Sequence, residues 1–407
     1  MRRRTVCTMG AFLCLCMFLS LSMQASSLAD IDDGGAVGRS AGVTPPLRVS
    51  RKSLRQRGHH DAGARDDLAC DELASSNPLP PAPAGSLRFF SIGDWGVRGL
   101  SVGSDAQMRV ARGMSCAARR WPVRFVLTLG DNFYGSGVTS VDDAQFEHKF
   151  ESVYSDASLN VPWFPALGDH DQCGDVDAQA AYSMRSERWT MPSAYYQELL
   201  SFDGGDVQLV VVDWVRLEGA FSETSGDRRF HDRLRANQAG REAADAHWAW
   251  LRRVLTLGDP TWRIVVGHRP LASVSARSAR DDVEFPAEAR TRAALKELML
   301  SAGVDVWLNG HDHTAQVACA ESGGGSATTF ATAGIGGYDL HALRPREEWP
   351  AETTYADASF HGFAAHTVTA EEIVSYFLDE TGEVRHEFVV RKGGGCAGSG
   401  RGRGGGG

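Results

Sequence analysis

Five apolar segments of this sequence each end in a glycine, and a side chain able to bind a metal ion follows within a few residues. The segments are FFSI, VLTL, FPAL, IVV and VWLN, and the side chains after them are carboxylates, imidazoles and one phenol. In chain order these residues are Asp94, Asp131, Tyr134, Asp169, His170, His268, His311 and His313. One such turn carries little information, but five of them indicate a shared site.

The chemistry of this set is that of a metal centre. Short apolar runs rich in β-branched and aromatic residues are typical of buried strands. Open α/β sheets bind ligands at the carboxyl ends of their strands, and glycine there lets the backbone turn so that the next side chain points into the crevice. Carboxylate, imidazole and phenolate groups together suit iron, manganese or zinc.

The elements that must position these residues alternate between strand-like and helix-like periodicity. Helical spacing of apolar residues predicts helices within residues 142–154, 246–255 and 289–303. The stretch 362–390 predicts antiparallel strands with a hairpin turn at ETGE, residues 380–383. Together these patterns favour an α/β class in which helices cover packed sheets.

The two ends of the chain differ from this central part. Three arginines, an apolar stretch and small residues predict a secretory signal peptide at residues 1–29. A retained signal anchor is the alternative, although the stretch is short for a span; after cleavage we expect no stable membrane span. Composition predicts a disordered tether at 30–85 and a disordered Gly-rich tail at 393–407, which leaves 86–392 as the domain that carries the site.

Charge and cysteine content limit the partners and the compartment. The formal net charge of −9 argues against a nucleic-acid partner, because phosphate backbones need basic patches. Five cysteines remain after signal cleavage: Cys70, Cys116, Cys173, Cys319 and Cys396. The secretory pathway permits disulfides, but an odd number leaves at least one thiol free or paired between chains, and spacing does not decide the pairing.

The five segments, taken together, resemble the sequence blocks of the metallophosphoesterases, and among these the purple acid phosphatases. The blocks are GDWG, GDNFY, GDHD, VVGHRP and NGHDHTAQ, in that order. The stretches 188–196, 210–214 and 362–384 are further similar to the mammalian-type tartrate-resistant branch. The resemblance implies the fold of the calcineurin-like superfamily: a four-layer α/β/β/α sandwich of two mixed sheets flanked by helices.

The same resemblance implies two adjacent metal ions, one Fe³⁺ and one divalent ion (Fe²⁺, Zn²⁺ or Mn²⁺). The residues that resemble ferric-site ligands, with the carboxylate that bridges both ions last, are Asp94, Tyr134, His313 and Asp131. The residues at the positions of the second site's ligands are Asp169, His268 and His311. His170 resembles the outer histidine that contacts the substrate phosphate and helps proton transfer, and Asn132 is expected to orient phosphate.

Two positions depart from the family pattern. Asp169 stands where the family has a neutral asparagine, so the centre carries one more negative charge. We expect this charge to weaken the attraction for phosphate or to select a different second metal. Arg277 falls, counting without gaps, where the mammalian-type pattern has a histidine. An arginine can hold phosphate bidentately; the alternative is a realigned loop on which Arg277 is solvated.

The function that these residues predict is a secreted or endolysosomal acid phosphatase with a dinuclear metal centre. It would hydrolyse phosphate monoesters by attack of a metal-activated hydroxide. Its substrate would be a small phosphomonoester or a phosphoprotein, and we expect a monomer. The alternatives are a phosphodiesterase or phosphoprotein phosphatase that uses the same site, or a metal-impaired binding protein, for which Asp169 is the only support.

Overall fold

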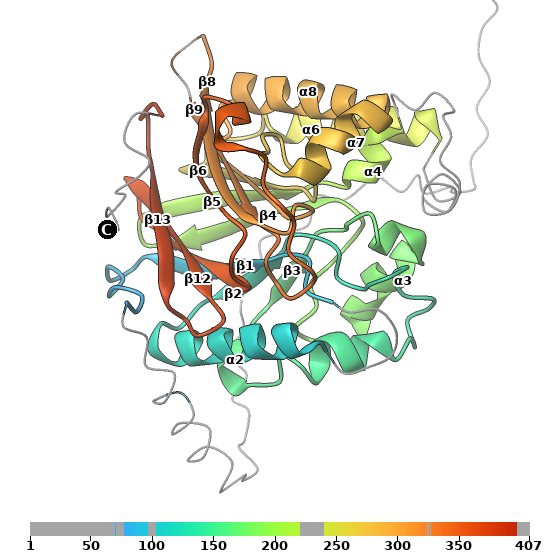
Figure 1. Ribbon diagram of the computed structural model, residues 1–407, viewed down its shortest axis with the longest axis vertical. Helices are drawn as coiled ribbons and strands as arrows, with labels where there is room; N and C mark the ends of the chain where they lie inside the picture. The colour runs from blue at the N-terminus through green and yellow to red at the C-terminus, as the bar shows by residue number, and fades with distance from the viewer. Residues whose placement is uncertain are drawn as a thin grey trace, which may run out of the picture. The chain divides into compact units, whose positions relative to one another are not determined.

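The computed structural model describes Cys70 and residues 77–96, 103–219 and 240–396, apart from 324 and 326. The predicted signal peptide, most of the predicted tether and most of the predicted tail lie outside these residues. The described part of residues 50–407 is built on two β-sheets with helices on their outer faces (Figure 1).

The first sheet has six strands in the order β13-β12-β11-β1-β2-β3. Its strands are β1 (Leu87–Ile92), β2 (Phe125–Thr128), β3 (Trp163–Pro165), β11 (Gly362–Val368), β12 (Glu372–Asp379) and β13 (Val384–Arg391). The strands β1, β2 and β3 run parallel, whereas β11 joins β1 in antiparallel fashion and continues into β12 and β13. The predicted antiparallel C-terminal strands and their hairpin are therefore confirmed.

The second sheet has seven strands in the order β10-β8-β9-β7-β6-β5-β4. Its strands are β4 (Tyr196–Phe202), β5 (Gly205–Val211), β6 (Trp262–Val266), β7 (Val306–Asn309), β8 (Ala315–Glu321), β9 (Ala327–Ala333) and β10 (Thr353–Asp357). The central strands β5, β6, β7 and β9 are parallel, and the outer ones pair antiparallel. Both sheets are thus mixed.

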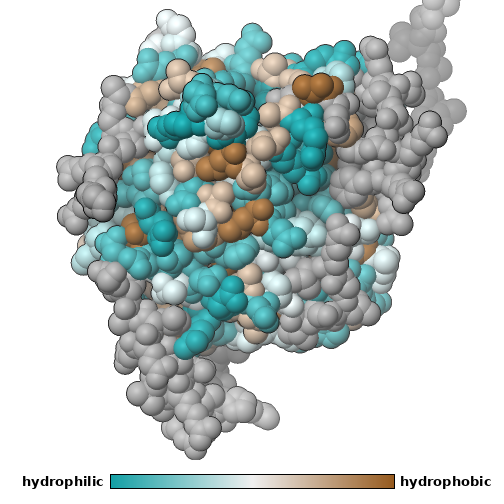
Figure 2. Space-filling model, viewed as in Figure 1, coloured by the Kyte–Doolittle hydropathy of each residue, from teal (hydrophilic) through white to brown (hydrophobic). Residues whose placement is uncertain are grey.

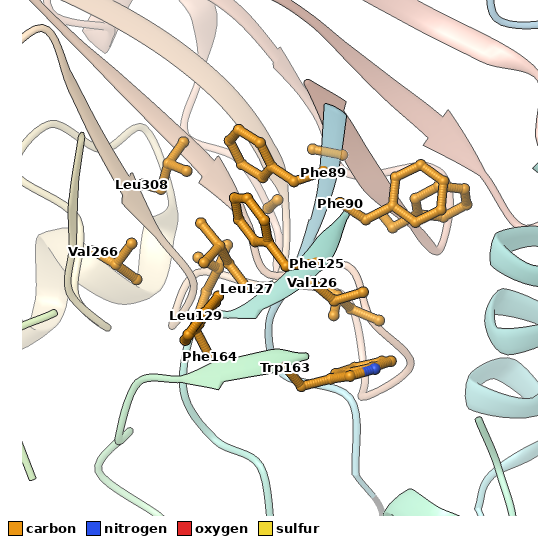
Figure 3. Packing of buried hydrophobic residues seen from close by; sticks show 14 of the residues in the cluster. Phe89, Phe90, Phe125, Val126, Leu127, Leu129, Trp163, Phe164, Val266 and Leu308 are labelled. Atoms are coloured by element: carbon orange, nitrogen blue, oxygen red, sulfur yellow. The ribbon is translucent and has the colours of Figure 1, made fainter. Parts of the chain in front are cut away.

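The hydrophobic core follows from the alternation of side chains along the strands. On β5, Val207 and Leu209 belong to the cluster that also contains residues of the first sheet, whereas Val210 belongs to a second cluster with the outer helices. Figure 3 shows Phe125 of the first sheet and Val266 of the second in the same group of buried side chains. A strand that is buried on both faces is typically a continuous run of apolar residues. The apolar segments of the sequence show this pattern.

Helices cover the outer faces of the two sheets. The helix α2 (Asp105–Arg120) lies against the first sheet, where it contacts β11. The helices on the side of the second sheet are α4 (Trp214–Glu218), α6 (Arg241–Val254), α7 (Ala276–Glu284) and α8 (Pro286–Ser301); the short α3 (Val176–Ala181) lies near the ends of the strands (Figure 1). The predicted sandwich of two mixed sheets flanked by helices is confirmed.

Two of the three predicted helices are present. Residues 246–255 and 289–303 lie largely in α6 and α8. Residues 142–154 hold only a six-residue π-helix, η1 (Phe146–Glu151). The carboxylate of Asp143 accepts hydrogen bonds from the backbone N–H groups of Thr139 and Gln145, and such local bonds compete with a helix start. The helices α2 and α7 were not expected.

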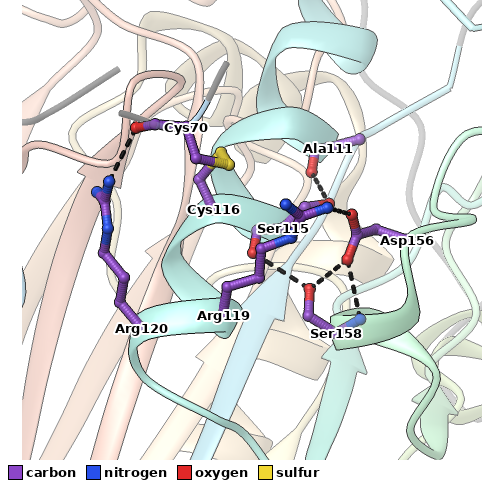
Figure 4. Close-up of a disulfide and its surroundings, with 8 residues drawn as sticks. All are labelled: Cys70, Ala111, Ser115, Cys116, Arg119, Arg120, Asp156 and Ser158. Atoms are coloured by element: carbon purple, nitrogen blue, oxygen red, sulfur yellow. Dashed lines mark hydrogen bonds and ion pairs between the residues drawn. A yellow bond between two sulfur atoms is a disulfide. The ribbon is translucent and has the colours of Figure 1, made fainter. Parts of the chain in front are cut away.

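Two disulfides attach the flanking segments to the domain. Cys70, within the predicted tether, is bonded to Cys116 on α2 (Figure 4), and Cys396 at the start of the predicted tail is bonded to Cys319 on β8. Cys173 is the described cysteine that belongs to neither disulfide. The odd thiol was expected, and the disulfides indicate folding in an oxidising compartment.

None of the helices in the described ranges is both long and apolar enough to cross a bilayer. In Figure 2 the coloured part of the visible face is largely hydrophilic, with brown residues in small separate groups.

Candidate metal centre

The candidate site lies where the ends of β1, β2, β6 and β7 meet. Asp94, Asp131 and His311 each follow one of these strands closely, and each has a positive φ, at 58°, 53° and 66°. Within the described ranges they are the non-glycine residues with positive φ. Left-handed backbone at such residues costs about 1–3 kcal/mol each and persists where the surroundings enforce it, commonly at functional sites.

The glycines before Asp131, Asp169 and His311 are required for a steric reason as well as for the turn. A Cβ atom on Gly310 would collide with the carboxylate of Asp94, and one on Gly168 would collide with Asp131. A Cβ atom on Gly130 would come within 2.5 Å of the ring of His268. The glycine-plus-ligand pattern in the sequence thus reflects close packing of the candidate ligands against neighbouring turns.

One group of candidate ligands gathers around Asp94. Its Oδ1 atom accepts a hydrogen bond from the Tyr134 hydroxyl at 3.0 Å and lies 3.3 Å from Nε2 of His313. The Tyr134 oxygen is 3.2 Å from the same Nε2 atom. The Nδ1 atom of His313 contacts the backbone carbonyl of Asp339, which leaves Nε2 to face the carboxylate and the phenol.

A second group gathers around Asp169. Its Oδ1 atom lies 2.8 Å from Nε2 of His268 and 3.3 Å from Nδ1 of His311. The Nδ1 atom of His268 is bonded to the carbonyl of Leu129 at 2.9 Å, so its Nε2 atom faces the site. When one ring nitrogen of a metal-binding histidine is hydrogen-bonded to a carbonyl, that bond fixes the tautomer of the ring. Ligand atoms of Asp169, His268 and His311 lie within 4.8 Å of one another.

Asp131 connects the two groups. Its Oδ1 atom lies 3.4 Å from Nε2 of His268, and ligand atoms of Asp94, Asp131 and His268 also fall within 4.8 Å of one another. Burial alone would raise the pKa of Asp131, but the neighbouring His268 outweighs it and lowers the pKa to about 2. Asp131 is therefore an ionised carboxylate placed between the two groups, as a bridging ligand requires.

The electrostatics of the site call for cations. Burial, together with Asp131 and Asp94, raises the pKa of the Tyr134 hydroxyl well above its usual range. Burial opposes a charged His268, yet Asp131 outweighs this and raises the imidazole pKa well above its usual range. The buried carboxylates thus oppose a negative charge on Tyr134 and favour a positive charge on His268. Their negative charge is not balanced by the surrounding residues, and metal ions would balance it.

The outer side chains at the mouth of the site are His170 and Arg277. The Nδ1 atom of His170 is 2.9 Å from the carbonyl of Gly135, and its Nε2 atom lies 3.9 Å from Asp131. Arg277 lies at the start of α7, where Ser275 caps the helix; burial would lower the pKa of its guanidinium, but Asp169 and other acids outweigh this and raise it. Both residues are therefore near the candidate ligands.

Asn132 does not face the site. Its Oδ1 atom accepts hydrogen bonds from Trp95 and Thr128, and its Nδ2 atom donates to the carbonyl of Ala166 at 2.8 Å. The side chain is fully buried. The expected contact between Asn132 and phosphate is thus not supported, because these bonds use the amide to brace neighbouring loops.

Two acids adjacent to candidate ligands hold the loops in place. Asp171 accepts hydrogen bonds from the backbone N–H groups of Gly168, Asn132 and Phe133 at 2.8–3.1 Å. Burial, with a contribution from Asp131, raises the Asp171 pKa to about 6. Asp312 accepts a bond from Ser278 at 2.8 Å and also contacts Ser273. Both carboxylates thus brace the loops next to candidate ligands through hydrogen bonds.

Sequence reasoning missed a second layer around the site. The ring of Tyr338 stacks on Tyr134 with 4.0 Å between centroids, and His341 stacks on His313 at 3.8 Å. Both residues belong to the loop 334–341, whose sequence GIGGYDLH is rich in glycine. The signal was available, since the sequence GIGGYD places an aromatic residue directly after flexible glycines.

A buried arginine next to the second group was also missed. The Nη2 atom of Arg269 lies 3.6 Å from Oδ2 of Asp169, and its Nη1 atom contacts Glu288 on α8. Glu288 in turn accepts a bond from Arg292 at 2.8 Å. Burial opposes ionisation of Asp169, but His311 and Arg269 outweigh it and hold its pKa well below the usual range.

The fold and the site together define a metal-dependent phosphoesterase. The family described as calcineurin-like phosphoesterase matches residues 87–315. Tartrate-resistant acid phosphatase type 5 of Oryctolagus cuniculus is 32% identical over 73% of this chain and 89% of its own length. Purple acid phosphatase 4 of Arabidopsis thaliana is 30% identical over 77% of this chain and 86% of its own length.

Solved structures show the same fold at lower identity. The structure titled "GAP50 the anchor in the inner membrane complex of Plasmodium" has a TM-score of 0.58 at 22% identity and covers 75% of this chain and 89% of that one. Purple acid phosphatase PPD1 from yellow lupin (Lupinus luteus) seeds has a TM-score of 0.53 at 16% identity and covers 77% and 55%.

The chain belongs to the calcineurin-like phosphoesterase family and, within it, to the purple acid phosphatases. It is accordingly a metal-dependent acid phosphatase with a dinuclear metal centre, as the sequence predicted. Its substrates carry phosphate.

Proposed function

We propose that this protein hydrolyses phosphate monoesters at acidic pH with one Fe³⁺ and one divalent ion (Fe²⁺, Zn²⁺ or Mn²⁺). The observation that supports this most strongly is the convergence of seven buried oxygen and nitrogen donors in two groups that share Asp131. The proposed ligands are Asp94, Asp131, Tyr134, Asp169, His268, His311 and His313.

The choice of Fe³⁺ for the first group rests on Tyr134. Its hydroxyl is buried among carboxylates that oppose its ionisation, so a strongly charged hard cation is needed to hold it as a phenolate. When bound, the two ions would polarise the phosphoryl group and lower the pKa of a water molecule.

The residues at the mouth would handle the substrate. His170, oriented by the carbonyl of Gly135, would place Nε2 near the phosphate and move a proton during the reaction. Arg277, at the first turn of α7, would hold a phosphate oxygen pair. Because Arg277 cannot release its proton near neutral pH, proton transfer would fall to His170.

The proposal extends to the compartment and the assembly. The predicted signal peptide at residues 1–29 and the two disulfides support entry into the secretory pathway, with secretion or an endolysosomal destination. We propose a monomer whose catalytic domain spans residues 86–392. The net charge of −9 supports a small phosphomonoester or a phosphoprotein, rather than a nucleic acid, as the substrate.

Activity on an aryl phosphate monoester and on the matching aryl diester tests the proposal. We expect a much higher kcat/KM for the monoester with the wild type, and a loss of about 100-fold or more in His170→Ala, the scale of general acid–base catalysis. Asp142→Asn, an exposed acid paired with Arg185, serves as the control and should match the wild type. A preference for the diester would favour the phosphodiesterase alternative, and a protein without metal and activity would favour the binding protein.

A further inference from the structure

Asp281 is a buried acid on α7 that the proposed ligand set does not use. The residue is 5% exposed, although it lies on a short surface helix. Its Oδ2 atom lies 3.7 Å from Nε2 of His311 and 3.4 Å from Nε of Arg277. Buried carboxylates of this kind need a partner. The Oδ1 atom of Asp281 lies 3.8 Å from Nε of the exposed Arg280, whereas its Oδ2 atom faces a proposed metal ligand and a proposed phosphate contact.

The ring of His311 has one nitrogen toward the site and one toward Asp281. Its Nδ1 atom is 3.3 Å from Asp169, within the second group of donors. Its Nε2 atom is buried and has no hydrogen-bond partner among the described residues. The backbone N–H of His311 donates to Asp94 at 2.9 Å, which holds the main chain of this turn in place.

We propose that Asp281 is a positioning residue for the second metal site, which rests on the proposed function. Its carboxylate accepts the Nε2–H of His311 and thereby makes Nδ1 of that ring the metal donor. Metal-binding histidines commonly donate their other N–H to a carboxylate, which orients the ring and strengthens it as a ligand. A small rotation of the ring would bring this 3.7 Å contact within hydrogen-bond distance.

The helix α7 gives this role a structural basis. Ser275 caps its first turn and Phe285 ends it, so Arg277 and Asp281 lie one turn apart on the same side. The same Oδ2 atom faces both Arg277 and His311. Through Asp281, α7 therefore holds a phosphate contact and a metal ligand in one fixed arrangement.

The test compares the two metal sites in Asp281→Ala and Asp281→Asn. In Asp281→Ala we expect the affinity for the second metal, measured by chelator competition, to fall about 10–100-fold, while the visible iron–tyrosinate band is retained. Asp281→Asn should recover part of the affinity, because its amide oxygen can accept the same N–H. Asp142→Ala, which removes a carboxylate that is 71% exposed and pairs with Arg185, is the matched control and should bind as the wild type does.

Second-metal affinity within about 2-fold of wild type in Asp281→Ala would overturn the inference. Equal weakening of both sites would do the same, since it would indicate general damage. If the alanine variant does not fold, NMR of wild-type protein with Co²⁺ in the second site decides: a slowly exchanging Nε2–H on His311 is expected, and coordination through Nε2 contradicts it. A wild type that binds no second metal would refute the proposed function itself.

Discussion

Replacing Asp169 by asparagine changes one charge in a buried part of the site. Asp169 is 2% exposed and faces His268, His311 and Arg269. The substitution keeps the shape of the side chain and gives the amide that relatives are expected to have. It also removes the charge that lies against the buried guanidinium of Arg269, so its consequences extend beyond the metal ions.

The size of the effect follows from the distance between the charges. At 3.6 Å and an effective dielectric constant of about 20, the attraction between Asp169 and Arg269 is about 5 kcal/mol. Glu288 still contacts Arg269 after the substitution, and the asparagine is easier to bury. We therefore expect the metal-free protein to lose about 3 kcal/mol of unfolding free energy, the lower end for a broken buried pair.

Urea unfolding of metal-free protein measures this loss. Asp142→Asn is the matched control, because Asp142 pairs with Arg185 at 2.9 Å but both side chains are more than half exposed; such pairs contribute about 0–1 kcal/mol. Asp169→Asn should also bind the second metal more weakly and change the pH–rate profile. A stability loss no larger than that of Asp142→Asn, with metal content and pH profile unchanged, would refute the reasoning.

Three further predictions concern parts of the structure outside this pair. Burial lowers the pKa of His366 to about 3, against about 6.5 in the unfolded chain. Below about pH 6.5 the unfolded chain therefore binds a proton that the folded protein does not bind, and the folded state loses stability. Urea unfolding should therefore show a stability loss between about pH 7.5 and pH 5 that is about 2 kcal/mol smaller in His366→Gln than in the wild type; an equal loss would contradict the buried neutral ring. Tyr338→Leu, which removes the ring stacked on Tyr134, should shift the visible iron–tyrosinate band with metal content unchanged, and an identical spectrum would show that the stacking has no electronic effect. Replacing both Cys70 and Cys116 by serine opens a loop with a sequence separation of 46 and should lower the unfolding free energy by up to about 4 kcal/mol; an unchanged urea midpoint would mean that the crosslink does not constrain the unfolded chain.

The proposed ligands could be found from the sequence because strand ends determine where they lie. Each follows an apolar run and a glycine, and parallel strands bring their carboxyl ends to one edge. Asp94 and Asp131, 37 positions apart in the chain, therefore end up in one cluster of donors. The strands β1, β2, β3, β6 and β7 were equally accessible, because each is a short apolar run, whereas polar residues interrupt β4, β8 and β9 and hide them from such a pattern.

The second layer could not be found in this way. Asp281 reaches His311 only through the placement of α7, a nine-residue helix with few apolar residues that the sequence did not predict. Arg269 meets Asp169 and Glu288 across three separate elements, and no local pattern encodes that contact. Asn132 was assigned to the substrate because it lies next to Asp131 in sequence, whereas its amide turns inward to Ala166.

The central claim, a dinuclear centre with an iron–phenolate bond at Tyr134, is tested most directly by the visible spectrum of the purified protein together with its metal content. We predict about two metal ions per chain, at least one of them iron, and a broad tyrosinate-to-iron band that disappears in Tyr134→Phe. An oxidised wild-type protein that holds both metals but shows no such band would contradict the account.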